Sequence, residues 1–135
     1  MNIFVFGTLL SETFRRIVLG RELNSEHICT ASLKNFCVYW AEGGPFPVIV
    51  PQDGSEVHGI VLKDLNEHDI ERLNYYELGF GYVLREALVE TNDCLQDVFA
   101  YFCKSSDMAS KNLWSFDDWL TKHSEIQYLA TTEFM

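Results

Sequence analysis

Two short segments of the sequence contain residue types that can do anion-binding or acid–base chemistry. The first is Phe6-Gly7-Thr8-Leu9-Leu10, where a glycine ends an apolar stretch just before a predicted helix. Backbone N–H groups at such a turn can hold an anion or a developing oxyanion. Glycine suits the turn because a side chain would block the close approach of a ligand. The alternative is an ordinary strand–helix turn, since neither a Walker pattern nor G-x-G-x-x-G is present.

The second segment is Leu-Asn-Tyr-Tyr-Glu at residues 73–77, which ends a predicted helix just before Gly79-Phe80-Gly81. A carboxylate near a helix C-terminus is disfavoured by the helix dipole. Glu77 also has aromatic neighbours in Tyr75, Tyr76 and Phe80, so we expect burial and the dipole to raise the pKa of its carboxyl group. A raised pKa suits a group that moves protons near neutral pH. The alternative is a solvated glutamate at a helix end.

The elements that must position these segments are strands interrupted irregularly by helices. Strands are predicted at residues 2–6, 27–36 with a continuation to 41, 48–50, 57–63, 82–91 and 95–102. Helices are predicted from a Ser11 cap to Leu19, from an Asn66 cap to the glycines after Glu77, and from Ser115 to the end in two pieces. This order indicates an α+β fold with a mixed, mostly antiparallel sheet that curls toward a barrel and has helices around it.

Glycine and proline mark the connections between these elements. Turns are predicted at residues 42–45, 52–55 and 92–93, and a loop at residues 105–111. The strand at 48–50 lies between Pro47 and Pro51, which favours a sheet edge. Gly59, inside the strand at 57–63, indicates a bulge or a close approach of another backbone. The whole chain is predicted to be one domain, residues 1–135, in which residues 105–135 form a helical C-terminal extension.

Length and charge exclude several classes of function. The chain has 135 residues, enough for one domain without disulfides or a metal. Ten Lys and Arg against twenty Asp and Glu give a net charge of −10, which disfavours nucleic acid and an anionic membrane surface as partners. The acidic residues favour solubility, and the alternative is an interaction surface for a basic partner. The first apolar run, residues 3–6, is too short for a signal peptide or membrane span, so a cytoplasmic protein is expected.

Cysteine and histidine spacing gives no support for a metal site or a redox motif. No pair of cysteines has C-x-x-C spacing and no pair of histidines has H-x-x-x-H spacing. We therefore expect no metal and no cofactor. The four cysteines are expected to be buried or half-buried free thiols: Cys29, Cys37, Cys94 and Cys103.

Four motifs in order resemble those of the gamma-glutamylcyclotransferase-like superfamily. They are Phe-Val-Phe-Gly-Thr-Leu at residues 4–9, Phe-Pro-Val-Ile-Val-Pro at 46–51, Val-His-Gly-Ile-Val-Leu at 57–62, and Leu-Asn-Tyr-Tyr-Glu at 73–77 followed by Tyr82. Their order and spacing agree with the family over residues 1–102, and the last thirty residues resemble an extension of some bacterial members. The resemblance implies a compact mixed barrel with surrounding helices, without a metal or an organic cofactor.

The resemblance also implies a site and a reaction. The residues around the glycine turn, Phe6 to Leu10, would line a cavity together with Tyr82, while Glu77 would occupy the position of the catalytic glutamate. Tyr101 would either line the cavity or pack in the core. The α-amine of a γ-glutamyl substrate would attack its own γ-carbonyl, forming 5-oxoproline and releasing an amine or amino acid.

Three departures from the family pattern bear on substrate choice. Arg85 stands three residues after Tyr82, where many members have Tyr-x-Arg. Phe6 replaces the usual tyrosine and removes its hydroxyl, and Asn74 replaces the usual aspartate, which is expected to be a surface or capping change. The leaving group stays open among glutathione, a γ-glutamyl amino acid, a γ-glutamylamine and a γ-glutamyl-modified intermediate, and the oligomeric state is not specified. The alternative function is a non-catalytic module that binds a small ligand or a protein on the same fold.

Overall fold

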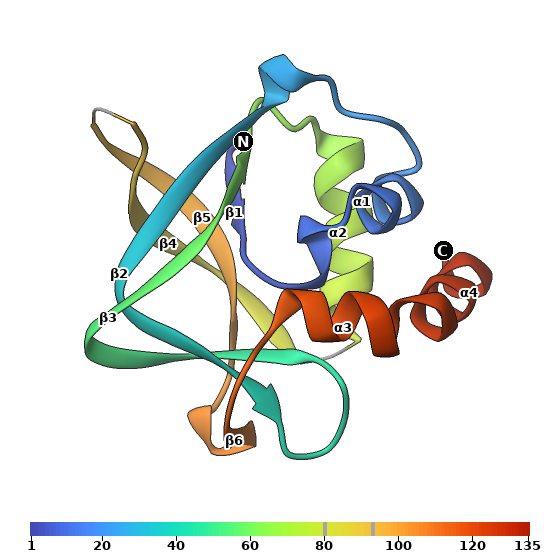
Figure 1. Ribbon diagram of the computed structural model, residues 1–135. Coiled ribbons are helices and arrows are strands. Elements are labelled where there is room, and N and C mark those ends of the chain that lie inside the picture. Colours follow the sequence, from blue (N-terminus) through green and yellow to red (C-terminus); the bar gives the residue numbers. More distant parts are fainter. Residues whose placement is uncertain (80, 93) are drawn as a thin grey trace.

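The computed structural model describes residues 1–79, 81–92 and 94–135. A strongly curved sheet forms one side of the molecule and helices pack against the other (Figure 1). The predicted roles of Phe80 beside Glu77 and of Asp93 in a turn concern positions outside these ranges.

Five strands close into a barrel-like ring, which confirms the predicted α+β class. They are β1 (Ile3–Val5), β2 (Ile28–Ala41), β3 (Pro47–Leu62), β4 (Tyr82–Glu90) and β5 (Leu95–Cys103). The order around the ring is β3-β1-β5-β4-β2, and β2 pairs again with β3. Only the β1–β5 pair in this ring is parallel, within the described ranges. A further strand, β6 (Ala109–Leu113), pairs with β2 outside the ring.

β1 is short, yet it is buried on both faces. Ile3 and Val5 pack in the cluster between barrel and helices, whereas Phe4 packs in the second cluster, among strand side chains. This division follows from the alternation of side chains along a strand. A Cβ atom on Gly59 of β3 would lie 2.3 Å from the carbonyl oxygen of Val5. The close backbone approach predicted at Gly59 is therefore confirmed, and it fixes the end of β1 next to Gly7.

β2 and β3 form one long antiparallel hairpin whose register shifts between Lys34 and Phe36. Residues 52–55 of β3 bulge out there, opposite Asn35. Asn35 has a φ of 67° and Gly54 a φ of 83°, and the amide oxygen of Asn35 accepts a hydrogen bond from the Gly54 N–H at 3.1 Å. A bulge of this kind bends the hairpin and increases its twist, which helps the ring to close.

This bulge corrects two sequence predictions. The turn predicted at residues 52–55 is wrong, and the two strands predicted at 48–50 and 57–63 are parts of the single strand β3. Gly54 has the positive φ that a turn would need. The residues on both sides of it nevertheless pair with β2, so the strand continues through the bulge.

Four helices cover the barrel: α1 (Glu12–Leu19), α2 (Glu67–Leu78), α3 (Phe116–Lys122) and α4 (Ser124–Phe134). They meet at Phe14 of α1, whose ring centroid lies 5.3 Å from that of Tyr76 and 5.7 Å from those of Trp119 and Tyr128. The Ser11 side chain caps α1, as predicted, and its hydroxyl also lies 2.6 Å from the Tyr128 hydroxyl. The C-terminal helices are thus joined to the segment that follows β1.

The loop predicted at residues 105–111 is wrong. A 3-10 turn, η3 (Ser106–Met108), is followed by β6, which pairs with the end of β2. The sequence of β6, Ala-Ser-Lys-Asn-Leu, has no β-branched residue, so its extended conformation depends on this pairing. The two-piece helix predicted after Ser115 is confirmed by α3 and α4.

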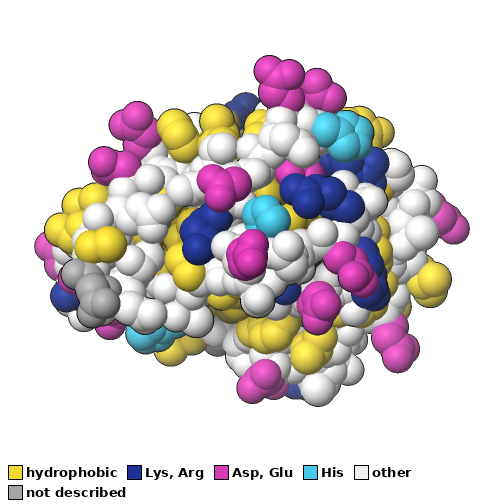
Figure 2. Space-filling model, turned by 90° about the horizontal axis from the view of Figure 1, so that it is seen from above, with side chains coloured by type: hydrophobic (Ala, Val, Ile, Leu, Met, Phe, Trp, Pro, Cys, Tyr) yellow, Lys and Arg dark blue, Asp and Glu magenta, His cyan; other side chains and the backbone are white. Residues whose placement is uncertain are grey.

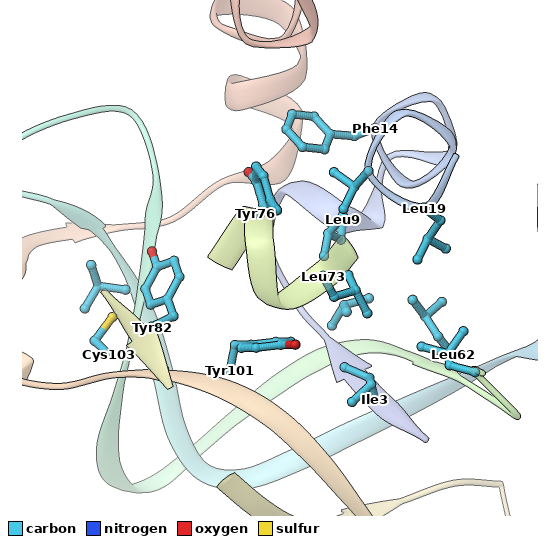
Figure 3. Close-up of a cluster of buried hydrophobic side chains, with 14 of the residues drawn as sticks. Ile3, Leu9, Phe14, Leu19, Leu62, Leu73, Tyr76, Tyr82, Tyr101 and Cys103 are labelled. Atoms are coloured by element: carbon cyan, nitrogen blue, oxygen red, sulfur yellow. The ribbon is translucent and has the colours of Figure 1, made fainter. Parts of the chain in front are cut away.

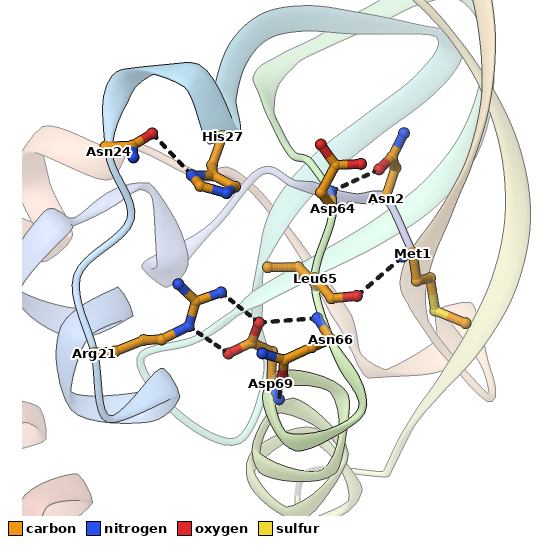
Figure 4. Close-up of polar contacts among 9 residues, drawn as sticks. All are labelled: Met1, Asn2, Arg21, Asn24, His27, Asp64, Leu65, Asn66 and Asp69. Atoms are coloured by element: carbon orange, nitrogen blue, oxygen red, sulfur yellow. Dashed lines mark hydrogen bonds and ion pairs between the residues drawn. The ribbon is translucent and has the colours of Figure 1, made fainter.

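A buried carboxylate fixes the start of α2. Asp69 is fully buried and accepts hydrogen bonds from the guanidinium of Arg21 at 2.9 and 2.6 Å (Figure 4). The same carboxylate accepts a bond from the Asn66 N–H at 3.0 Å, while the Asn66 side chain accepts one from the Asp69 N–H at 2.9 Å. This is a capping box, and it confirms Asn66 as the N-cap. Arg21 holds the pKa of Asp69 below its usual range.

The surface carries both signs of charge and one exposed thiol. Acidic side chains are spread among basic and apolar ones on the face shown in Figure 2. Cys94 is exposed, so its predicted burial is wrong, whereas Cys103 is buried and the other two cysteines are half-buried. Within the described ranges, none of the helices is both long and apolar enough to cross a membrane.

We expect Asp69→Ala to lower the free energy of unfolding by roughly 2–3 kcal/mol, because it removes the carboxylate half of the capping box and the two charge-assisted hydrogen bonds to Arg21. The pKa of Asp69 is lowered in the folded protein, so its stabilising contribution is present at neutral pH and lost as pH falls below about 4. Urea unfolding at several pH values measures both effects. Glu67→Ala, an exposed change in the same helical turn, is the control, and an equal effect of the two substitutions would contradict this role of Asp69.

Candidate active site

A pocket lies where the end of β1, the turn after it, the start of β3 and the last turns of α2 come together. It holds about 490 Å³ of space between atoms, part of which is open to solvent. Its lining comprises Phe4, Val5, Phe6, Gly7, Thr8, Leu9, Phe46, Pro47, Tyr76, Glu77, Tyr82 and Tyr101. The pocket is therefore mainly aromatic and apolar, with one carboxyl group.

Glu77 supplies that carboxyl group from the last turn of α2. The helical repeat places it beside Leu73 and Tyr76, on the face that α2 buries. The residue is only 7% exposed, and its carboxylate accepts no hydrogen bond from the described part of the chain. Burial raises its pKa to about 8. An unpartnered buried carboxylate is costly, so this position favours either a protonated acid or a bound cationic group.

The turn opposite Glu77 is a 3-10 turn, η1 (Thr8–Leu10), which begins after Gly7. The first N–H groups of a helical turn have no partner within the turn, so those of Thr8 and Leu9 are available at the pocket. Arg15 holds the carbonyl side of the turn, since its guanidinium donates to the carbonyl oxygens of Leu9 and Leu10 at 3.0 and 2.9 Å. The turn therefore presents backbone donors to the pocket while Arg15 holds its carbonyl groups.

Gly7 is required for a reason that the sequence did not reveal. A Cβ atom there would lie 2.4 Å from Cγ of Pro47, which also lines the pocket. A side chain would therefore collide first with the protein, at the start of β3, before it could obstruct a ligand. A substitution at Gly7 tests packing as well as binding.

Three tyrosines surround the carboxyl group, and two are fixed by strong hydrogen bonds. Tyr82 donates to the carbonyl oxygen of Pro47 at 2.5 Å, and Tyr101 donates to the side-chain oxygen of Asn74 at 2.6 Å. The hydroxyl of Tyr76 lies 3.3 Å from that of Thr8. In Figure 3 these rings come from α2 and from the two strands beneath it. Burial, and then the nearby charge of Glu77, raises the pKa of Tyr76 and Tyr101. Burial, then the Cys103 thiol and then Glu77, raise the pKa of Tyr82, so all three are neutral phenols.

The structure brings together most of the residues singled out in the sequence. Glu77, Phe6, Gly7, Thr8, Leu9, Tyr82 and Tyr101 all line the pocket. Leu10 does not line it, because the 3-10 turn carries its side chain away to a half-exposed position. Tyr101 fulfils both expected roles, since it is 6% exposed and also faces the pocket.

Sequence reasoning missed five lining residues: Phe4, Val5, Phe46, Pro47 and Tyr76. Tyr76 could have been found from the helical repeat, because it shares the buried face with Leu73. The prediction for Asn74 is also wrong. This residue is neither a surface residue nor a helix cap, because its side-chain oxygen accepts a hydrogen bond from the hydroxyl of Tyr101. Within the described ranges, no three His, Cys, Asp or Glu side chains are grouped as metal ligands.

Comparison with known proteins gives relatives over almost the whole chain. The family described as "Gamma-glutamyl cyclotransferase, AIG2-like" matches residues 3–121. AIG2-like protein B of Arabidopsis thaliana is 29% identical over 137 aligned positions, which cover 99% of this chain and 77% of that protein. AIG2-like protein D of the same plant is 26% identical, covering 98% of this chain and 88% of that protein.

Solved structures share the fold. The solution structure of an Arabidopsis thaliana protein aligns with a TM-score of 0.69 and 26% identity, covering 99% of this chain and 89% of that one. A yeast protein described as a gamma-glutamyl cyclotransferase specific to glutathione aligns with a TM-score of 0.60 over 99% of this chain and 94% of that one. Its identity of 12% makes this a likeness of fold alone.

We expect the carboxyl group of Glu77 to titrate with a pKa near 8, because burial disfavours its charged form. NMR titration of ¹³C-labelled glutamate side chains measures this value. Glu77→Gln should remove the signal, and Glu71→Gln, an exposed change on the same helix, should leave it in place. The raised pKa also means that the free energy of unfolding of the native protein falls as pH rises from the pKa of Glu77 in the unfolded chain to about 8. Glu77→Gln lacks this titrating group, so its free energy of unfolding should increase relative to that of the native protein over the same range. An NMR titration midpoint for Glu77 near the ordinary glutamate pKa of about 4.3 would show that its side chain is solvated.

Proposed function

Because the chain belongs to the gamma-glutamyl cyclotransferase, AIG2-like family, we propose that it converts a small γ-glutamyl compound into 5-oxoproline and a free amine or amino acid. The α-amine of the substrate attacks its own γ-carbonyl carbon, and a five-membered ring closes as a tetrahedral intermediate, which becomes the lactam when the leaving nitrogen departs. The bond from that carbon to the leaving nitrogen then breaks. No metal or organic cofactor takes part in this reaction.

The single observation that carries the proposal is the buried, unpartnered carboxyl group of Glu77 in the pocket. A substrate α-ammonium group is the natural partner for a carboxylate in an aromatic pocket, since the ion pair removes the cost of an isolated charge. The tyrosine rings add attraction for a cation. The pocket is therefore suited to the amino acid head of a γ-glutamyl compound.

Glu77 then has two proton transfers to perform. Its carboxylate takes one proton from the α-ammonium group, which makes the amine nucleophilic. The resulting carboxylic acid gives that proton to the leaving nitrogen as the tetrahedral intermediate collapses, so the carboxylate is regenerated. The ring nitrogen keeps one hydrogen as the lactam N–H and loses its other proton to solvent, and the released amine takes up a proton from solvent. A carboxyl group with a pKa near 8 is well matched to both steps at neutral pH.

The turn at Gly7 supplies the complementary donors. The N–H groups of Thr8 and Leu9 can bind the substrate α-carboxylate or the oxyanion that develops on the γ-carbonyl oxygen. Ring closure also requires a folded substrate, and holding it in that shape contributes on the order of 7–11 kcal/mol toward lowering the barrier. Arg15, which anchors this turn from outside the pocket, is a positioning residue.

The reaction class is tested by incubating the protein with a panel of γ-glutamyl compounds and detecting 5-oxoproline by mass spectrometry. The panel includes glutathione, γ-glutamyl amino acids and γ-glutamylamines. A metal chelator is present throughout, because the proposed reaction needs no metal. Absence of 5-oxoproline from every compound, with the protein folded, would overturn the proposal.

Glu77→Gln should lower turnover by about 10²–10⁴-fold, because the amide cannot accept the amine proton. The side chain keeps its size, so the variant remains folded. Glu71→Gln, the exposed control on α2, should retain full turnover. Turnover of Glu77→Gln within a few-fold of the native protein would remove Glu77 from the mechanism and favour the non-catalytic binding module.

A further inference from the structure

The side chain of Asn74 connects α2 to the wall of the pocket through Tyr101. The Tyr101 hydroxyl donates to the Asn74 side-chain oxygen at 2.6 Å, although the two residues lie 27 positions apart in the sequence. Tyr101 is buried and lines the pocket of Glu77, whereas Asn74 is half-buried and does not line it. In Figure 3 the hydroxyl of Tyr101 points away from Tyr82. The bond therefore keeps the ring in the pocket wall while its only donor is directed to Asn74.

Asn74 lies one helical turn before Glu77 on α2. Side chains three positions apart on a helix are neighbours, with Cβ atoms about 5–6 Å apart. A hydroxyl that reaches Asn74 is thus one turn away from the carboxylate of Glu77. Burial, and then the charge of Glu77, raises the pKa of Tyr101, which also indicates that the two groups are near each other. A buried hydroxyl without an acceptor is costly, so a Tyr101 released from Asn74 would donate to this carboxylate instead.

A hydrogen bond from Tyr101 to Glu77 would oppose the proposed reaction in two ways. It would stabilise the ionised form of the carboxyl group and so lower its pKa. It would also occupy an oxygen that the substrate α-ammonium group needs. A phenol has one hydrogen to donate, so the bond to Asn74 prevents both effects.

The ionisable side chains around Glu77 in the described ranges are neutral. They are Tyr76 on α2, Tyr82 on β4, and Tyr101 and Cys103 on β5, and burial raises the pKa of each. The pocket residues from β1, from the turn after it and from the start of β3 carry no ionisable side chain. The titration of Glu77 therefore depends on its burial and on the hydrogen bonds that it receives, rather than on a neighbouring charge.

We propose that Asn74 is a positioning residue for the reaction, which holds the Tyr101 hydroxyl so that the carboxylate of Glu77 stays free for the substrate α-ammonium group. This inference deepens the proposed function, because it assumes that Glu77 receives that group. The neutral amide is part of the role. An aspartate would hold the same hydroxyl but would add a negative charge one turn from Glu77.

Two substitutions of Asn74 should move the NMR titration midpoint of Glu77 in opposite directions. Asn74→Leu has a similar size but no acceptor, so the freed hydroxyl should lower the midpoint by about 1 pH unit or more. Asn74→Asp should raise it by about 0.5 pH unit or more through repulsion between like charges. Tyr75→Phe removes a hydroxyl from a side chain that is 55% exposed on the same helix and does not line the pocket, so it should leave the midpoint unchanged.

A double substitution identifies the freed hydroxyl as the cause. Tyr101→Phe combined with Asn74→Leu removes the donor, so the midpoint of Glu77 should return to its native value. With a γ-glutamyl substrate, Asn74→Leu alone should move the acid limb of kcat/KM to lower pH. On the plateau above that limb, it should lower kcat/KM by about tenfold, because the substrate must displace a hydrogen bond to a charged group.

The outcomes separate this inference from the proposed function. An unchanged midpoint in Asn74→Leu, or no recovery in the double variant, would overturn the inference while the reaction stands. Asn74→Asp keeps an acceptor for Tyr101, so it decides the matter if Asn74→Leu does not fold, and an unchanged or lower midpoint would contradict the role. If the midpoints move as expected but the native protein forms no 5-oxoproline, the proposed reaction is wrong, and Asn74 still keeps Glu77 free for a cationic ligand.

Discussion

The carboxylate of Asp69 joins three parts of the chain: Arg21 after α1, the Asn66 cap and the body of α2. It sets both the residue at which α2 begins and the place where the helix meets the barrel. Glu77 follows eight residues later, about 12 Å along the axis at 1.5 Å per residue. The depth of the pocket's carboxyl group therefore depends on an ion pair at the opposite end of the same helix.

The two buried carboxyl groups of α2 have opposite environments. Asp69 is surrounded by donors and its pKa is lowered, whereas Glu77 has aromatic neighbours and its pKa is raised to about 8. The first stabilises the folded chain and the second costs stability whenever it is ionised. Such a cost is typical of functional sites, where the surrounding structure holds a group in an unfavourable state. Cap and site are thus linked by one rigid element.

Local patterns were sufficient for much of this arrangement. The Asn66 cap, the burial of Glu77 and the glycine turn follow from spacing within a few residues, together with the family resemblance. The parts that could not be predicted depend on distant partners. β3 continues through a turn signal because β2 pairs on both sides of it, and β6 is extended only through its pairing with β2. The bond between Asn74 and Tyr101 likewise joins residues that no local pattern connects.

The position of β1 has a consequence for how the chain acquires its site during synthesis. Ile3 of β1 pairs with Leu62 of β3 on one side and with Phe99 of β5 on the other. The ring therefore cannot close until β5 has been synthesised and has paired with β1. Contacts between such distant residues form slowly, since a long loop has to be ordered first. The turn at Gly7 is held by β1, so a nascent chain that has not reached residue 99 has no complete pocket. The pocket is therefore complete only after β5, which also supplies Tyr101, has paired with β1.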